Sequence, residues 1–205
     1  MAYIDSMYDV MAMETGMLKA VMAYVKEHCP EELALLKADI PEITEIPTIR
    51  FHEAKQIMEE KYGHKSKNRY DLNPDEEVLL CQWAKEEHGS DFVFVTHFPS
   101  AKRPFYAMDD PEDPKLALSF DLLFRGLEIT TGGQRIHDYQ EQIAKLEARK
   151  MNVELFESFT MLHKYGMPPH GGLGIGLERL TMQLLGLNNV RDASMFPRDM
   201  NRLEP

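Results

Sequence analysis

Alternating glycines followed by an amphipathic segment constrain the fold of this chain more than any other feature. The stretch covers residues 168–187 and reads PPHGGLGIGLERLTMQLLGL. From Gly172 to Gly176, glycine alternates with Leu173 and Ile175. An extended strand would therefore carry apolar side chains on one face and none on the other. Because interior glycines weaken a strand, the pattern indicates that a flat ligand or another backbone lies on the bare face.

The second half of this stretch predicts a helix that begins near Leu177 and ends at Gly186. Arg179 falls in the first turn, where the helix dipole disfavours a cation by roughly 0.3–1 kcal/mol. Its presence there indicates an anionic partner, although a packing strand followed by a solvated arginine would give the same spacing. The stretch is not a dinucleotide-binding fingerprint, because Arg179 stands where that motif needs glycine or alanine.

A second informative stretch, residues 120–137, reads FDLLFRGLEITTGGQRIH. Asp121 and Glu128 are each flanked by apolar residues, as acids facing a polar cleft would be. A fully extended chain would hold them roughly 23 Å apart on opposite faces. They converge only if the chain reverses at Arg125 and Gly126, and such a pair would suit Mg²⁺ together with substrate phosphates. From the residues alone, a metal site and a pair of surface or ion-paired acids remain equally open.

Composition excludes several classes of protein. The 205 residues are 43% apolar, which suits one domain with a sizeable core. We expect no membrane span, because no stretch of about twenty apolar residues exists. No leader pattern opens the sequence. Cys29 and Cys81 lie outside any motif and are expected to be reduced thiols, which places the protein in the cytoplasm. The eight histidines show no metal-ligand spacing.

The formal net charge is −11. A chain this acidic cannot hold RNA by bulk electrostatic attraction. Any contact with RNA must therefore be local, or must lie on parts of a longer protein that this sequence does not contain.

Propensity and capping signals predict helices and strands in the order of an α+β fold, with a mixed, mostly antiparallel sheet flanked by helices. Asn73 and Pro74 give one of the clearest helix starts. The expected helices cover residues 6–28, a short stretch after Pro30, and 54–62, 74–88, 140–150, 153–164 and 177–185. The expected strands cover the end of a strand at residues 1–5, then 48–51, 91–98, 104–108, two within 119–131, and 172–176.

The stretch at 172–180 resembles motif 3 of the class II aminoacyl-tRNA synthetases, which combines alternating glycines with an acid, an arginine and an apolar residue. In that family the bare face lies under the adenine of ATP, while the arginine stacks on the base and reaches the terminal phosphate. The resemblance gives these roles to Arg179 and to the glycines, with His170 shaping the ATP pocket. The implied ATP-binding set includes Gly172, Gly174 and Gly176.

The run Gly-Leu-Glu…Gly-Gly-Gln-Arg-Ile-His is shared by fewer enzymes than motif 3 and resembles the archaeal type of aspartyl-tRNA synthetase. It implies that Asp121 and Glu128 hold Mg²⁺ against the ATP phosphates, with the Thr131 hydroxyl nearby in the substrate site. Arg135 would receive the side-chain carboxylate of aspartate, since a guanidinium can grip a carboxylate bidentately. Catalysis would rest on Glu128 and Arg179.

The resemblance implies an ATP- and Mg²⁺-dependent aspartate–tRNA ligase that acts on tRNA(Asp) and works as a homodimer; charging of tRNA(Asn) stays open. Three alternatives remain: an asparaginyl enzyme, an asparagine synthetase built on the same core, and a non-catalytic module derived from a synthetase. Ile136 and His137 after Arg135 favour aspartate over asparagine.

The resemblance covers residues 1–205 as the C-terminal part of a catalytic domain. The anticodon-binding domain, motif 1 and motif 2 of the family have no counterpart in this sequence. We therefore expect the chain to retain the fold of its half and to have little or no ligase activity by itself.

Overall fold

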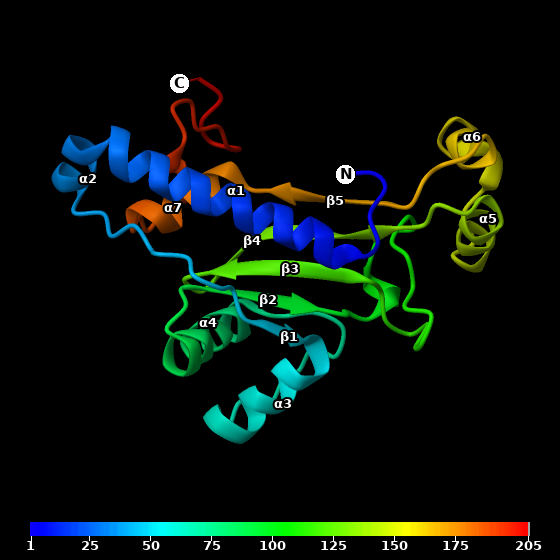
Figure 1. Cartoon of the computed structure of the whole chain (residues 1–205), viewed down its shortest axis with the longest axis horizontal. Coiled ribbons are helices and arrows are strands. Elements are labelled where there is room, and N and C mark those ends of the chain that lie inside the picture. The colour runs from blue at the N-terminus through cyan, green and yellow to red at the C-terminus, as the bar shows by residue number, and fades with distance from the viewer. Residues whose placement is uncertain (205) are drawn as a thin grey trace.

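The computed structural model describes residues 1–204, which are built around a five-stranded sheet (Figure 1). The strands lie side by side in chain order. The first two are parallel and all other neighbours are antiparallel. This arrangement confirms the predicted mixed, mostly antiparallel sheet. The strands are β1 (Thr48–Arg50), β2 (Phe92–Thr96), β3 (Ser119–Phe124), β4 (Leu127–Arg135) and β5 (His170–Ile175).

Local signals in the sequence define the helix ends. The Ser6 side chain accepts the N–H of Tyr8 at the start of the first helix, and Pro74 opens α4. Gly89 and Gly186 end their helices in the left-handed conformation, which costs glycine little. The helices are α1 (Met7–His28), α2 (Pro30–Leu36), α3 (Phe51–Tyr62), α4 (Pro74–His88), α5 (Tyr139–Ala148), α6 (Glu157–Lys164) and α7 (Leu177–Leu185).

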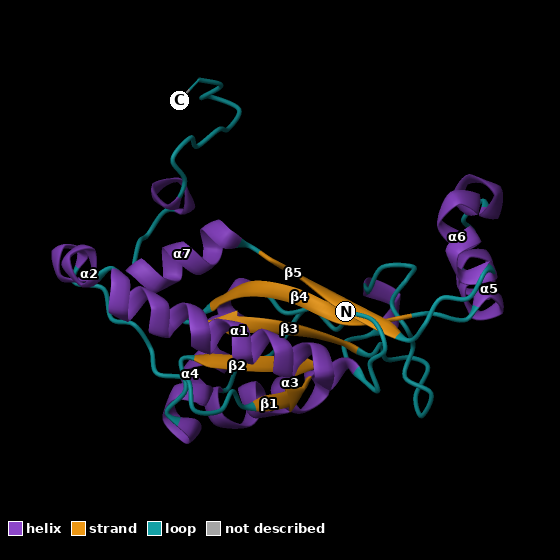
Figure 2. Ribbon diagram, turned by 45° about the horizontal axis from the view of Figure 1, so that its top comes forward, coloured by secondary structure: helices purple, strands orange, loops and turns teal. Residues whose placement is uncertain are grey.

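Helices α1 and α7 cover one face of the sheet. Their buried side chains pack against an aromatic cluster that alternates along β2 and β3, including Phe92, Phe94 and Phe120. Helices α3 and α4 cover the other face over β1, β2 and β3, where Val93 and Leu123 point. Figures 1 and 2 show these two layers, with α5 and α6 set apart at one end of the strands.

Apart from the contact of α4 with the start of β4, the second face is open over β4 and β5, and this opening positions the candidate site. Asp121 pairs with Thr131 across β3 and β4, and Thr131 pairs with Gly174 on β5. Directly opposed residues share a face, so these residues share the open face. None of the helices within residues 1–204 is both long and apolar enough to cross a membrane.

Three predicted elements differ from the structure. Residues 104–108 form a turn, in which Ala107 N–H donates to Pro104 O, and only Ala107 bridges to the sheet. Residues 1–5 make a single bridge at Ala2 instead of ending a strand. The helix predicted over 153–164 is divided into a 3₁₀ turn, Val153–Phe156, and α6. In the first two places aromatic or β-branched residues suggest a strand, but the backbone pairs with the ends of β4 and β5 through single bridges only.

Candidate active site

A tight turn and a β-bulge bring the two predicted carboxylates together. Arg125 and Gly126 both have positive φ, at 48° and 90°, and reverse the chain between β3 and β4 as expected. The register shifts on β4, so that Leu122 faces Thr130 and Leu123 faces Glu128. The extra residue changes which face the following side chains occupy. Glu128 therefore reaches the face of Asp121 and Thr131, although a regular strand would have pointed it away.

The Thr131 hydroxyl lies between the two acids. Its Oγ1 is 2.9 Å from Asp121 Oδ1 and 3.1 Å from Glu128 Oε1. A hydroxyl has one hydrogen and can donate fully to only one carboxylate at a time. Both contacts of the hydroxyl are favourable when one of the two acids carries a proton, or when a bound cation balances their negative charge.

Arg103 is the direct partner of Asp121. Its two terminal nitrogens contact both carboxylate oxygens, at 3.0 and 2.7 Å. The two side chains are only 10% and 4% exposed, and the guanidinium also lies over the Phe98 ring, 3.9 Å from its centre. A bidentate pair of this kind fixes both groups. Arg103 thus supplies the positive charge that the buried carboxylate requires.

Burial and mutual repulsion favour protonation of the acids in this cluster. Burial raises the pKa of Asp121, although Arg103 opposes the shift. Burial, and then the charge of Asp121, raise the pKa of Glu128. Glu77 at the start of α4 accepts the backbone N–H of Glu128 at 2.7 Å, and burial raises the pKa of Glu77 to about 6. An added cation would relieve this concentration of negative charge.

The glycines of β5 leave a bare surface between two arginines. A Cβ at Gly172 would lie 3.3 Å from the Arg135 guanidinium, and one at Gly176 would lie 3.3–3.4 Å from the stem of Arg179. A Cβ at Gly174 would meet nothing within 4 Å. The open floor at Gly174 is therefore flanked on both sides by cationic side chains, a shape that suits a flat, negatively charged ligand.

Arg179 extends from α7 toward the carboxylate cluster. Its Nη1 donates to the backbone oxygen of Glu128 at 2.8 Å and lies 3.6 Å from that residue's Oε1. The side chain is 49% exposed. The anionic partner that the sequence indicated for this first-turn arginine thus includes Glu128, and about half of its surface remains free for a ligand.

A cavity of about 330 Å³ occupies the other end of this face. Arg135 lines it from the end of β4, with its guanidinium 5.0 Å from the centre of the Tyr106 ring. Within residues 1–204, no carboxylate forms an ion pair with Arg135. The cavity wall also contains Arg103, Thr131, Gly172 and Gly174.

His170 lies at the Arg135 end of β5, opposite Arg135 in the register and outside the cavity wall. Its Nδ1 lies 3.1 Å from the Pro168 oxygen. Burial lowers the pKa of His170, and the nearby charge of Arg135 acts in the same direction. The structure therefore places His170 beside Arg135, at the end of the strand away from Arg179.

Sequence reasoning gave no role to three residues of this site: Arg103, Tyr106 and Glu77. Arg103 directly precedes, and Tyr106 lies within, the segment predicted as a strand over residues 104–108, a pattern that indicates no ligand contact. Glu77 looked like an ordinary first-turn acid of α4. Its contact with Glu128 depends on the tertiary packing of α4 against β4, and no local sequence pattern indicates this packing.

The oxygen donors of the cluster fit a hard divalent cation. Two carboxylates and a hydroxyl converge, and this is the kind of donor that Mg²⁺ accepts alongside phosphates and water. Within residues 1–204, no group of three or more His, Cys, Asp or Glu side chains is placed to hold a metal by itself. The cluster therefore suits a cation that arrives with a phosphate ligand.

Comparison with known proteins identifies the family to which this fold belongs. The family profile described as tRNA synthetases class II (D, K and N) matches residues 1–200. An aspartate–tRNA(Asp/Asn) ligase of Deinococcus radiodurans is 47% identical over 100% of this chain and 48% of its own length.

Two solved structures have the same fold. An aspartyl-tRNA synthetase of Entamoeba histolytica has a TM-score of 0.92 at 30% identity, over 100% of this chain and 43% of its own. An asparaginyl-tRNA synthetase of Pyrococcus horikoshii has a TM-score of 0.89 at 30% identity, over 100% of this chain and 48% of its own.

The mixed sheet, the glycine-rich strand β5 and the helix α7 that carries Arg179 together define the catalytic fold of a class II synthetase. The chain belongs to the class II tRNA synthetases of the aspartate, lysine and asparagine group. It spans about half the length of the curated relatives it matches.

Proposed function

We propose that this chain is the C-terminal part of the catalytic domain of an aspartate–tRNA ligase. The observation that carries the proposal is Arg135, a half-buried guanidinium in the cavity wall with no carboxylate partner within residues 1–204. A cation held in a cavity without a counter-ion is suited to an anionic substrate. Aspartate supplies a side-chain carboxylate at the size this cavity accepts.

ATP would occupy the bare surface of β5. Its adenine would lie on the open floor at Gly174, between Gly172 and Gly176, and Arg179 would stack on the base. The support for this placement is the free space above Gly174 and the half-exposed guanidinium beside it. The phosphates would then extend toward Glu128, to which Arg179 is already bonded.

Asp121 and Glu128 would hold Mg²⁺, with Thr131 beside them. When bound, the ion neutralises phosphate charge. Glu128 is the more accessible of the two acids, while Asp121 is held by Arg103. The protein's own contribution is to fix both carboxylates on one face through the turn at Arg125 and the bulge in β4.

The reaction would take two steps. The α-carboxylate of aspartate attacks the α-phosphate of ATP, forming aspartyl-adenylate and releasing pyrophosphate. The terminal hydroxyl of the tRNA then attacks the aspartyl carbonyl, and AMP leaves. No nucleophile of the protein is required, so the residues contribute positioning and charge stabilisation. Arg179 and Glu128 carry most of this role in the chain.

The proposed partners are aspartate and tRNA(Asp), in a cytoplasmic protein that is a homodimer at full length. Charging of tRNA(Asn) as a second substrate stays open, because the Deinococcus relative is named for both tRNAs. Cys29 and Cys81 are free thiols, which agrees with a reducing compartment. The chain by itself is expected to have little ligase activity.

An asparaginyl enzyme is the nearest alternative, since that class shares the fold. Amino-acid-dependent exchange of pyrophosphate into ATP, measured on the full-length protein that contains this chain, separates the two. Exchange with aspartate and not with asparagine supports the proposal. Exchange with asparagine alone would overturn it, and no exchange with either would favour a non-catalytic module. An asparagine synthetase would form asparagine from ammonia without tRNA.

A further inference from the structure

The loop between α3 and α4 carries a row of exposed cations. Along residues 64–69, exposed side chains alternate with half-buried ones. The chain bends at Lys67 and at Arg69, so the alternation shows which side chains this loop turns inward and is not the pattern of a regular strand. The exposed positions are all basic: Lys65, Lys67 and Arg69, which we call the basic ribbon. The inward positions are His64, Ser66 and Asn68.

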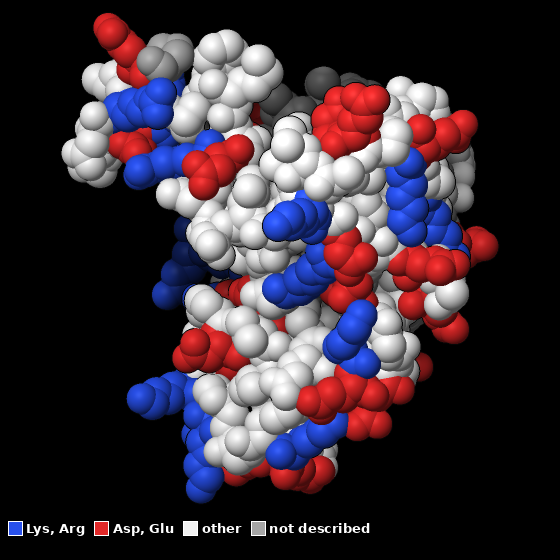
Figure 3. Space-filling view, turned by 90° about the vertical axis from the view of Figure 1, so that its left-hand side faces the viewer, with Lys and Arg blue, Asp and Glu red and all other residues white. Residues whose placement is uncertain are grey.

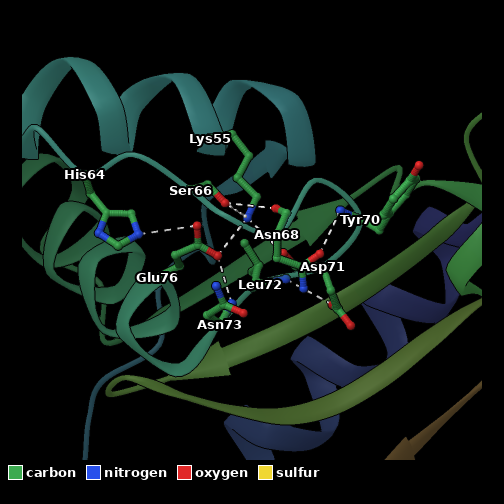
Figure 4. Close-up of polar contacts among 9 residues, drawn as sticks. All are labelled: Lys55, His64, Ser66, Asn68, Tyr70, Asp71, Leu72, Asn73 and Glu76. Carbon is green, nitrogen blue, oxygen red and sulfur yellow. Dashed lines mark hydrogen bonds and ion pairs between the residues drawn. The ribbon is translucent and has the colours of Figure 1, made fainter.

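The ammonium group of Lys55, a half-buried residue, holds the inward side of this loop (Figure 4). Lys55 on α3 donates to Ser66 Oγ at 2.9 Å, to the backbone oxygen of Asp71 at 2.8 Å and to Glu76 Oε2 at 2.7 Å. All three of its donors are therefore used. Ser66 in turn donates to the backbone oxygen of Asn68 at 2.9 Å. These three hydrogen bonds of Lys55, which we call the anchor, use none of the ribbon cations. The side chains of the ribbon are therefore free to bind a ligand.

Glu76 is the buried end of this anchor. Its side chain is fully buried, and its Oε2 also accepts the N–H of Asn73 at 2.8 Å. Burial acts to raise the pKa of Glu76, but the hydrogen bonds from Lys55 and from the Asn73 N–H outweigh it and the pKa is lowered. The acid therefore stays charged and bonded at neutral pH. A loop tied to a buried ion pair is held in one conformation.

The anchor places the ribbon beside the candidate active site. Glu76 and Glu77 are neighbours in the first turn of α4, and Glu77 accepts the N–H of Glu128. The charge of Asp71, at the end of the loop, also acts on Asp121. The ribbon thus borders the carboxylate cluster at which the phosphates of a substrate are expected.

The ribbon has the chemistry to bind the backbone of a nucleic acid. Its three cations lie within five residues of a segment that bends at Lys67 and at Arg69, so they can contact neighbouring phosphates of a flexible single strand. None of the three cations forms an ion pair within residues 1–204. Tyr70 follows directly and is 52% exposed, so an aromatic face for base stacking adjoins the cations.

The overall charge of the chain does not attract RNA. The chain has a net charge of −11, and on the face shown in Figure 3 acidic side chains lie among the basic ones. We propose that the basic ribbon and Tyr70 bind the unpaired strand of the tRNA that ends at the hydroxyl to be charged. This inference rests on the proposed function, since it names the surface through which the tRNA strand reaches that site.

Binding of a 5′-labelled tRNA(Asp) transcript to this chain, followed by fluorescence anisotropy across a range of salt, tests the inference. The variant Lys65→Gln/Lys67→Gln/Arg69→Gln should lower the slope of log affinity against log salt by about 2, since three single-strand phosphate contacts are lost. At about 0.1 M salt the affinity should fall roughly tenfold or more. The variant Tyr70→Ala should weaken binding roughly fivefold or more without changing the slope.

A matched control removes three exposed lysines elsewhere: Lys26→Gln/Lys37→Gln/Lys164→Gln. It carries the same charge change and should leave the slope near that of the wild type. Equal slopes in the ribbon and control variants, or no binding of the transcript by the wild-type chain, would overturn the inference.

Calorimetric titration with ATP and Mg²⁺ separates this inference from the proposed function. The ribbon variant should bind nucleotide as the wild type does. A selective loss of ATP binding would assign the ribbon to the nucleotide phosphates and overturn the inference. Ribbon-dependent binding of tRNA by a wild-type chain that binds no ATP would support the ribbon and contradict the proposed nucleotide site.

Discussion

Arg103 binds both carboxylate oxygens of Asp121, at 3.0 and 2.7 Å, and both side chains are almost fully buried. Asp121, a candidate metal ligand, therefore has a cationic partner from a neighbouring loop even when no metal ion is bound. The Thr131 hydroxyl connects this pair to Glu128. The stability of the sheet and the charge of the site are therefore linked through one arginine.

Replacing Arg103 should destabilise the fold. Arg103→Leu leaves a buried carboxylate without its partner, and we expect a loss of about 3–5 kcal/mol in the free energy of unfolding at pH 7. Because burial raises the pKa of Asp121, the penalty should shrink as the pH falls and the carboxyl takes up a proton. Urea unfolding at several pH values measures both effects. The double variant with Asp121→Asn should recover most of the loss, and a single-variant change below about 1 kcal/mol would contradict the account.

Substitution of two glycines should affect different properties: ATP affinity at Gly174 and stability at Gly132. Gly174→Val places a side chain in open space on a strand that favours β-branched residues, so stability should change by less than about 1 kcal/mol while ATP affinity falls at least about tenfold. Gly132→Ala puts its Cβ 2.5 Å from the Phe120 ring and should destabilise the fold by about 1–3 kcal/mol or more. Thermal unfolding and ATP titration of both variants check this contrast. Normal ATP binding by Gly174→Val would show that the adenine base does not lie on this surface.

Glu14 should make the stability depend on pH. It is fully buried in α1, neither of its carboxylate oxygens has a hydrogen-bond partner within residues 1–204, and burial raises its pKa from 4.5 to about 7. A raised pKa in the folded state gives stability that is fully present below about pH 4.5 and is lost as the pH rises through about 7. Glu14→Gln should therefore match the wild type near pH 4.5 and exceed it by about 3 kcal/mol at pH 8.

Unfolding of Glu14→Gln beside Glu27→Gln, an exposed acid of the same helix, provides the control. The Glu27 variant should show no such pH-dependent gain. A Glu14 variant that is less stable than the wild type at pH 8 would show that the buried acid is charged and partnered in solution.

Arg135 should govern recognition of the amino acid and not of ATP. In the full-length protein, Arg135→Gln removes a charged bidentate donor, so KM for aspartate should rise on the order of a hundredfold or more while KM for ATP changes little. Pyrophosphate exchange at varied aspartate and varied ATP separates the two constants. A parallel rise in both would instead indicate that the cavity has collapsed.

Local signals were sufficient for much of the fold. The cap at Ser6, Pro74 in the first turn of α4 and the terminal Gly186 of α7 gave helix boundaries close to those observed. The glycine alternation identified β5 and its bare face, because period-two spacing is a property of the strand itself.

The parts that could not be predicted depend on long-range geometry. The bulge that turns Glu128 toward Asp121 leaves no trace in the sequence, and a regular strand would have kept the two acids on opposite faces. The partnership of Arg103 with Asp121 joins positions eighteen residues apart through a turn that had been expected to be a strand. Arg135 lies on an extension of β4 beyond the predicted end at Thr131.

Calorimetric titration of this chain with ATP and Mg²⁺, alongside Arg179→Ala and Glu128→Ala, is the direct test of the nucleotide site. We expect Mg²⁺-dependent binding by the wild type that is lost in both variants, because Arg179 flanks the open floor of β5 and Glu128 faces the phosphates. A folded chain that binds no ATP, or variants that bind it as well as the wild type does, would contradict the assignment of this surface as a nucleotide site.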